Sequence, residues 1–264
     1  MNQIQEFLNA LRVQDWSGSE GPMRLSHKLE AADYAHAQLP ANVRILIERL
    51  DSEGGVPATS AGNLPRAFVE DIFECLQMSD AWRAVIRTDK KVMNEMDASA
   101  LHRARVVAHA AGFLALRKKR FQTTQKGKKL LAPDRAGDFY RELFTGYFRR
   151  FNLSYDLIYH DLPEIQATLP AILWRMDAEL RDWTPVAGLA PRILLPVVLQ
   201  RLRDFETQYF KSDDFLVGYV HEPLRRMGLL EVEHGDSNPL GIGQKSRIKT
   251  SRLWRKFLWF DWQP

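Results

Sequence analysis

Apolar residues recur every three or four positions along most of the chain, which is the spacing of amphipathic helices that pack against a core. In residues 41–55, for example, Val43, Leu46 and Leu50 share one face, and a Gly-Gly pair ends the segment. The same spacing predicts helices over residues 6–16, 26–39, 41–55, 64–77, 100–112, 125–131, 138–160, 165–180, 191–210 and 213–228, and residues 252–260 fit either a helix or a tail.

Several helix ends carry residues with capping or helix-breaking chemistry. Pro40 is expected to break the chain after the helix at 26–39, and Gly112 is expected to end the helix at 100–112. The segment 82–88 fits either a strand or a helical turn. The predicted N-terminal caps are Ser26 for residues 26–39, Asn63 for 64–77, and Asp97 or Ser99 for 100–112.

In two regions the apolar period changes from helical to alternating, which is typical of strands. Lys118 and Lys119 are expected to form the tight turn of a hairpin between the first such pair of segments. The second pair is separated by a longer loop. The predicted strands are residues 56–60, 113–117, 120–124, 229–233 and 246–251.

The order of these elements predicts the fold. Over residues 41–131 the order is helix, short strand, helix, helix, strand, turn, strand, which is that of a winged helix, a helix-turn-helix core with a small β-hairpin. A related order recurs at 213–260. We expect a mainly α protein (α+β) with two winged-helix-like units joined by a helical middle. The expected domains are a helical lead-in (1–40), one winged-helix-like unit (41–131), a helical connector (132–190) and another winged-helix-like unit (191–264).

The composition of the 264 residues fits a globular protein of a reducing compartment, because 45% are hydrophobic and Cys75 is the single cysteine. One cysteine excludes an internal disulfide and a cysteine-based zinc site. The first sixteen residues lack the pattern of a signal peptide, and the longest apolar stretch, 193–199, is too short to cross a bilayer. We therefore expect a cytoplasmic protein without membrane contact.

The net charge of +4 is modest, but its distribution is uneven. Seven basic residues and no acid lie within 117–129, and six more, again without an acid, lie within 245–256. A protein that binds nucleic acid through one basic face shows this pattern, although basic clusters are also common on solvated surfaces.

A winged helix places its third helix in the major groove and its hairpin tip on phosphate or in the minor groove. We expect Arg103 and Arg105 of the third helix to read bases to a limited extent, because that helix is otherwise rich in Ala and Val. The expected partner is double-stranded DNA, whose phosphate charges are neutralised by Lys and Arg side chains. The candidate contacts are Asn63, Arg66, Arg103, Arg105, Arg117, Lys118, Lys119, Arg120, Lys126, Lys128, Arg225, Arg226, Lys245, Arg247 and Lys249.

Two groups of aromatic residues bear on the alternative functions. The stripe Phe139, Phe144, Tyr147, Phe148 and Phe151 favours core packing over base stacking. A C-terminal group is expected either to seal a core or to form an edge for a protein partner, which makes a winged-helix interaction module in a mobile-element or defence assembly the main alternative. Its members are Trp254, Phe257, Trp259, Phe260 and Trp262.

Catalysis has weaker support. The seven histidines are scattered, and no Gly-rich phosphate loop with the required spacing is present. Glu231 and Glu233, with Lys245, resemble part of the residue set of a metal-dependent nuclease, which is the third hypothesis. We expect a protein that is not an enzyme and that holds no cofactor or metal.

The motifs TSAGNLPRAFV (59–69), AGFL (111–114) and TQKG (124–127) resemble those of an uncharacterised bacterial family named after an open reading frame of a root-inducing plasmid. The resemblance covers residues 40–155, with a weaker similarity at 213–256, and concerns the helical and winged part of those proteins rather than their β-rich namesake domain. It implies a bacterial cytoplasmic protein linked to mobile elements, and it supplies no catalytic residues.

Overall fold

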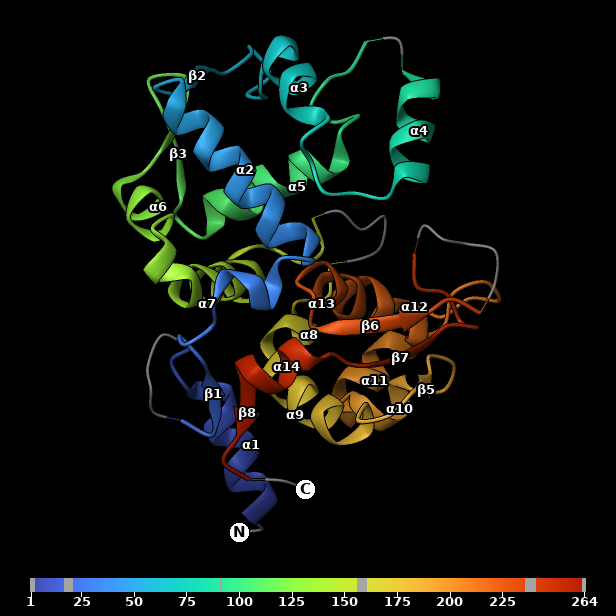
Figure 1. Ribbon diagram of the computed structural model, residues 1–264. Helices are drawn as coiled ribbons and strands as arrows, with labels where there is room; N and C mark the ends of the chain where they lie inside the picture. The colour runs from blue at the N-terminus through green and yellow to red at the C-terminus, as the bar shows by residue number, and fades with distance from the viewer. Residues whose placement is uncertain (1–2, 17–20, 91, 156–160, 236–240, 263–264) are drawn as a thin grey trace. The chain divides into compact units, whose positions relative to one another are not determined.

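A computed structural model describes residues 3–16, 21–90, 92–155, 161–235 and 241–262. Helices dominate, with 54% of residues in helices and 11% in strands, and the strands form small antiparallel sheets (Figure 1). The predicted mainly α class is therefore confirmed. Among the described residues, no helix is both long and apolar enough to span a membrane.

Contacts divide the chain into two compact units. Residues 27–151 form one of them, called the central unit here, and residues 1–26 with 152–264 form the other, called the split unit. This division differs from the boundaries at 40, 131 and 190 expected from the sequence. The predicted helical connector (132–190) is divided between the two units. Its first part belongs to the central unit, where η3 (Gly146–Arg150) packs on α5 (Ser99–Ala110).

The central unit contains a three-stranded sheet in the order β2-β4-β3 and a set of surrounding helices. Helix α2 packs along α5 and also contacts β4. Its elements are η1 (Ala31–Tyr34), α2 (Gln38–Ser52), β2 (Val56–Pro57), α3 (Arg66–Phe73), α4 (Asp80–Asp89), α5 (Ser99–Ala110), β3 (Leu114–Arg117), β4 (Arg120–Thr123), α6 (Gln125–Leu130), η2 (Pro133–Arg135), α7 (Ala136–Thr145) and η3 (Gly146–Arg150).

The small residues of α5 have a packing role. A Cβ placed on Gly146 would lie 2.6 Å from the Cα of Ala111, just after α5, so the two backbones are in contact. Ala104, Ala108 and Ala111 are fully buried. The Ala-rich sequence of α5 therefore reflects close packing against η3 and α2.

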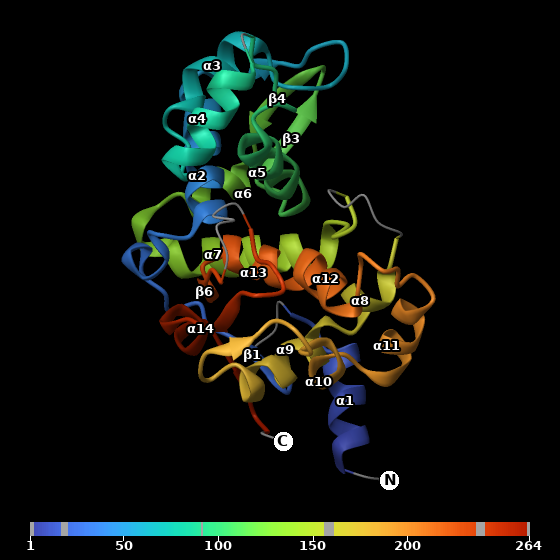
Figure 2. The same ribbon diagram turned by 90° about the vertical axis from the view of Figure 1, so that its right-hand side faces the viewer.

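The split unit repeats this construction with a second three-stranded sheet, β5-β7-β6. A separate pairing of β1 with β8 joins its two chain segments, and α1 packs along α9 (Figure 2). Its elements are α1 (Gln3–Val13), β1 (Met23–Leu25), α8 (Pro163–Ala167), α9 (Leu169–Glu179), β5 (Thr184–Pro185), α10 (Ala190–Ile193), α11 (Pro196–Arg203), α12 (Ser212–Leu216), η4 (Val217–His221), α13 (Glu222–Arg226), β6 (Leu230–Glu233), β7 (Arg247–Thr250), α14 (Arg252–Phe257) and β8 (Leu258–Phe260).

Several predicted helix boundaries are wrong: the helix predicted at 138–160 ends at Arg150, with 156–160 outside the described residues, and Leu258–Phe260 form a strand. Three further differences have a local reason. Pro40 does not break the chain but lies in the first turn of α2, where its missing N–H has no helical partner to lose. Ser26 caps no helix, because the first helical turn after it, η1, begins only at Ala31. The helix predicted at 191–210 is interrupted at Leu195, since the residue before Pro196 is extended.

The predicted caps also differ from the observed ones. Pro65, not Asn63, precedes the first residue of α3, and Ala98, rather than Asp97 or Ser99, precedes α5. Asp97 instead accepts the backbone N–H of Asn94 at 2.9 Å. The segment 82–88, which fitted a strand or a turn, lies in helix α4.

The aromatic stripe of the central unit is core, as predicted: Phe139, Phe144, Tyr147, Phe148 and Phe151 are all buried. The C-terminal aromatic residues also pack inward for the most part. Trp254, Phe257 and Phe260 are buried, and Trp262 stacks on Trp174 with 5.5 Å between ring centroids. Of the expected edge for a protein partner, only Trp259, 47% exposed, lies at the surface.

Candidate nucleic-acid interface

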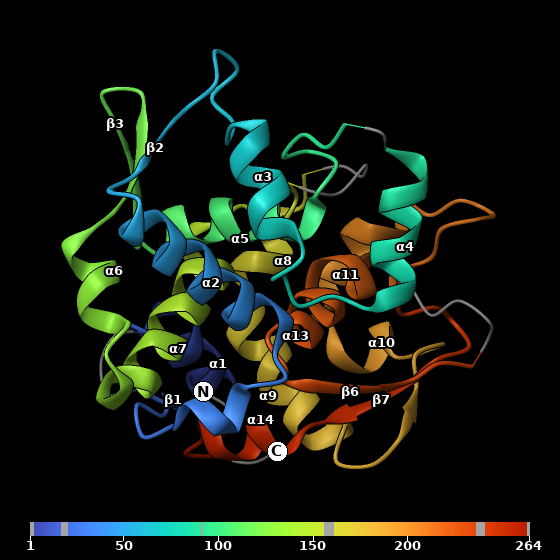
Figure 3. The same ribbon diagram turned by 45° about the horizontal axis from the view of Figure 1, so that its top comes forward.

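Strands β3 and β4 form the hairpin predicted at 113–124, called the central hairpin here. It projects from the helices of its unit (Figure 3). Leu114 and Phe121 lie on one face of the hairpin and are buried, whereas Arg117 and Arg120 lie opposite each other on the other face. The alternating sequence thus packs the apolar face of the hairpin against its unit, and the opposite face carries the two arginines.

Lys118 and Lys119 form the two-residue turn, with φ of 49° and 58°. A turn with positive φ at both central residues matches the twist of the strands, and Asn-Gly is the usual sequence for it. Each non-glycine residue in this left-handed region costs roughly 1 kcal/mol. The hairpin therefore retains two lysines at its tip despite an unfavourable backbone conformation.

Arg117, Lys118 and Lys119 are exposed and have no ion-pair partner among the described residues. No acid occurs in residues 114–123 to neutralise them. The tip of the central hairpin is therefore a group of uncompensated positive charges.

Other predicted cations of this region have partners within the central unit. Lys126 binds Glu142 at 2.6 Å and the carbonyl of Ala111 at 2.9 Å. Lys128 forms an ion pair with Asp51. Arg120 donates to the carbonyl of Gly55 at 2.5 Å. A cavity of about 510 Å³ behind the hairpin is lined by Arg117, Lys126 and Lys128, among other residues, so three predicted contacts do converge there.

Arg105 is part of a buried ionic cluster. The Nε of Arg105 and the Nδ1 of His102 lie 2.5 and 2.6 Å from one carboxylate oxygen of Glu95, whose side chain is fully buried. The other oxygen accepts the backbone N–H of Leu64 at 2.6 Å. Burial disfavours the charge, but the hydrogen bonds from His102, Leu64 and Arg105 outweigh it and lower the pKa of Glu95.

This cluster fixes the loop before α3 against α5, and Arg105 is therefore not available for the base contact expected of it. Its guanidinium also lies 5.1 Å from the ring centroid of Phe121. Sequence reasoning missed Glu95 because the pair joins residues ten apart across a helix start.

The remaining predicted contacts of the central unit lie near the start of α3 and on α5. Arg66 is exposed and donates from Nε to Asn94 Oδ1 at 2.8 Å. Asn63 is half-buried and closes a turn with Thr59, whose hydroxyl accepts its backbone N–H at 3.0 Å. Arg103 is half-buried on α5. These residues lie beside the Glu95 cluster rather than on the hairpin tip.

Strands β6 and β7 form the second hairpin, in the split unit, and its charges are largely compensated. Arg247 pairs with Glu233 at 3.2 Å. Lys249 pairs with Glu231 at 3.0 Å and lies 4.7 Å from the ring centroid of Trp183. The alternate glutamates of the predicted strand 229–233 could have indicated this pairing, because residues on the same face of adjacent strands contact each other.

The other predicted residues of the split unit behave similarly. Arg225 and Arg226 both pair with Glu222, at 2.8 and 3.5 Å. Lys245 is exposed. Nowhere in the described ranges do three or more His, Cys, Asp or Glu side chains gather as a metal site would require. Glu231 and Glu233 instead serve as partners of the two β7 cations.

The fold and the central hairpin define a mainly α protein that carries small antiparallel sheets. Residues 35–137 match the model of an uncharacterised family described as the Y4jL N-terminal domain. The matched residues all lie in the central unit and include the whole hairpin. No curated protein and no solved structure matches the chain.

We predict that Glu95→Gln lowers the free energy of unfolding by roughly 3 kcal/mol, because it leaves the buried Arg105 charge without its partner. Urea unfolding at pH 7 measures this. Glu74→Gln, which removes a carboxylate that is 57% exposed, is the control and should cost less than about 1 kcal/mol. Equal costs for the two variants would contradict a structural role for the cluster.

The same carboxylate should make stability depend on pH. Because the pKa of folded Glu95 lies below its ordinary value of 4.5, its stabilisation is complete above that pH and is lost as the pH falls through the folded pKa. We predict that unfolding experiments between pH 6 and 3 show a smaller loss of stability for Glu95→Gln than for the unaltered protein.

We predict that the double variant Lys118→Asn, Lys119→Gly is more stable than the unaltered protein, because it replaces the turn with the sequence that prefers this conformation. A gain of about 1 kcal/mol corresponds to a rise of roughly 3 °C in melting temperature. Lys245→Asn, on the other hairpin and outside any positive-φ position, should leave the melting temperature unchanged. A decrease for the double variant would contradict the strain in the turn.

Proposed function

We propose that the protein binds double-stranded DNA without catalysis, and that the central hairpin makes the principal contact. The observation that carries the proposal is the tip itself, where Arg117, Lys118 and Lys119 are exposed and uncompensated. Phosphate groups neutralised by such cations release counterions, and this release drives sequence-independent binding.

The order of elements in the central unit supports a winged-helix comparison. Helix α2, β2, α3, α5 and the β3–β4 hairpin occur in the order of that fold, with the additional helix α4 between α3 and α5, and β2 lies at the outer edge of the sheet beside β4. On this comparison the hairpin is the wing, and wing residues contact phosphate or the minor groove.

Helix α5 contributes less to the proposed interface than a recognition helix usually does. Arg105 is held by Glu95, and the Ala residues of α5 are packed against neighbouring helices. Binding should therefore show little sequence preference. The second hairpin contributes at most a minor part of the proposed interface, because Arg247 and Lys249 already have carboxylate partners.

The competing function is a winged-helix module that binds a protein in a mobile-element or defence assembly. The close packing and few polar groups of α5 favour it, because such a helix offers little for base recognition. With either function, we also propose that the protein is bacterial and cytoplasmic. We propose further that it belongs to the plasmid-named family that its sequence motifs resemble.

We predict salt-sensitive binding to a random-sequence 20-base-pair duplex, measured by fluorescence anisotropy. Three neutralised phosphates give a slope of log K against log salt of about −2.7, or roughly fortyfold weaker binding at 200 mM than at 50 mM salt. In Lys118→Asn, Lys119→Gly the slope should fall to about −0.9. Because this variant is expected to be more stable, lost binding cannot be ascribed to unfolding.

The matched control is Arg247→Gln, Lys249→Gln, which removes two cations from the second hairpin and should leave the slope unchanged. Absence of binding at 50 mM salt would refute the nucleic-acid function and favour the protein-binding module. Equal loss of binding in the two double variants would instead show that the hairpins contribute alike.

A further inference from the structure

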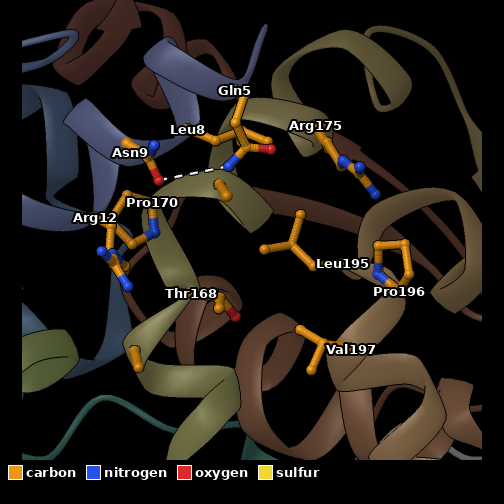
Figure 4. A pocket seen from close by; sticks show the side chains of 12 residues that line it. Gln5, Leu8, Asn9, Arg12, Thr168, Pro170, Arg175, Leu195, Pro196 and Val197 are labelled. Carbon is orange, nitrogen blue, oxygen red and sulfur yellow. Dashed lines mark hydrogen bonds between the residues drawn. The ribbon is translucent and has the colours of Figure 1, made fainter. Parts of the chain in front are cut away.

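The split unit contains a cavity of about 490 Å³ that has no counterpart in the sequence predictions. It is bounded by one face of α1, the N-terminal part of α9 and the segment that leads into α11 (Figure 4). Cavities of this size hold small molecules rather than single ions. All of its lining residues belong to the split unit.

The break in the predicted helix at 191–210 creates one wall of the cavity. Helix α10 ends at Ile193, and both Leu194 and Leu195 are extended, as is usual for the residue before a proline such as Pro196. The carbonyl of Leu194 is therefore left without a helical partner. Nη1 of Arg175 donates to that carbonyl at 2.7 Å. This bond fixes the arginine at the cavity, which it lines.

Arg175 is half-buried, yet within the described part of the chain it pairs with no carboxylate and makes no other side-chain hydrogen bond. Burial, with no compensating acid, lowers the pKa of its guanidinium. A guanidinium has five N–H donors, so most of the hydrogen-bonding capacity of Arg175 is unused. A half-buried cation without an anion is a costly arrangement unless a ligand supplies one.

A second arginine lines the same cavity from α1. Arg12 is exposed and also has no ion-pair partner among the residues described. Figure 4 shows Arg12 and Arg175 on opposite sides of the cavity. No Asp or Glu lines it, so both guanidinium groups favour an anionic occupant.

The rest of the lining combines apolar surface with neutral polar groups. Leu8, Leu195 and Val197 line the cavity, and Val197 is 67% exposed. Gln5 and Asn9 of α1 add side-chain amides, joined by a hydrogen bond of 3.5 Å. An apolar surface next to arginines without ion-pair partners suits a ligand that has both an apolar part and a negative charge.

We propose that this cavity binds a small amphipathic oxyanion, in which a carboxylate or a phosphate monoester is attached to an apolar body. Arg175, which is held at the cavity by the carbonyl of Leu194, binds the oxyanion, Arg12 on the opposite side adds positive charge, and the apolar residues of α1 and of the segment before α11 cover the body. Because the cavity lies wholly in the split unit, oxyanion binding there is independent of DNA binding by the central hairpin.

Isothermal titration calorimetry on the full chain tests the proposal with two probes, octanoate for the carboxylate and octyl phosphate for the phosphate monoester. At least one probe should bind with a dissociation constant below about 1 mM, a modest affinity for such a small ligand. 1-Octanol, acetate and inorganic phosphate, which each lack one of the two features, should bind at least tenfold more weakly. Preference for one of the probes identifies the oxyanion.

Arg175→Gln should weaken binding about tenfold or more, because it removes a charge-assisted hydrogen bond. Arg12→Gln should weaken it severalfold, because it removes positive charge from the cavity. Arg255→Gln, an exposed arginine of α14 away from the cavity, is the matched control and should bind normally. If Arg175→Gln does not fold, Arg12→Gln carries the test, since Arg12 is exposed.

Three results would overturn the proposal: no binding of octanoate or octyl phosphate up to 5 mM, equal binding of 1-octanol, or unchanged affinity in both arginine variants. None of them bears on the salt-dependent DNA titration, so failure of one proposal leaves the other intact.

Discussion

Both hairpins depend on the same hydrogen-bonded joint. In the central unit, Gly112, which follows α5, has φ of 76°. The hydroxyl of Thr124, at the end of the hairpin, donates a hydrogen bond to the Gly112 carbonyl at 2.7 Å. In the split unit, Gly228 has φ of 78°, and Ser251 donates to its carbonyl at 2.8 Å. The joint fixes the direction in which each hairpin leaves its helix.

The same hydroxyls also begin the next helix, since Thr124 accepts the N–H of Gly127 and Ser251 accepts that of Trp254. One side chain thus ties a helix end, a hairpin base and a helix start together. Because the joint uses only a left-handed glycine and a hydroxyl, it places no condition on the strands between, and the two hairpins are free to differ in charge.

That freedom explains the contrast between the hairpins. Strand β6 carries glutamates at alternate positions, opposite cations of β7, whereas β3 carries none opposite β4. Among the strand residues of the two hairpins, the cations without an ion-pair partner therefore belong to the central hairpin, although the backbone construction is repeated. The number of charges in each basic cluster does not predict which hairpin is neutralised, because the neutralising glutamates lie on the partner strand, outside the cluster.

Local chemistry made much of the fold predictable from the sequence. The central hairpin, its Lys-Lys turn and the glycine at 112 were predicted at their observed positions, because a change of period and a left-handed glycine are local signals. Pro40 and Asn63 were misassigned, because the helix start at Gln38 and the bond from Leu64 to Glu95 depend on tertiary packing.

The candidate sites were less predictable than the fold. The sequence indicates that residues 117–120 are basic, but the unpaired state of the tip and the engagement of Arg105 follow from contacts between distant residues. The cavity at Arg175 depends on a helix break that periodicity alone had excluded, since the apolar positions of 191–210 continue across Pro196.

The turn at Lys118 and Lys119 is the part of the structure on which the proposed contact with DNA depends. A hairpin whose tip serves only to reverse the chain is best formed by Asn-Gly, which adopts positive φ at little cost. Retaining two lysines there costs folding energy and gathers three like charges at one tip, and neither effect stabilises the unit. Under the proposed function, bound phosphate offsets the repulsion between these charges, whereas the cost of the left-handed backbone remains.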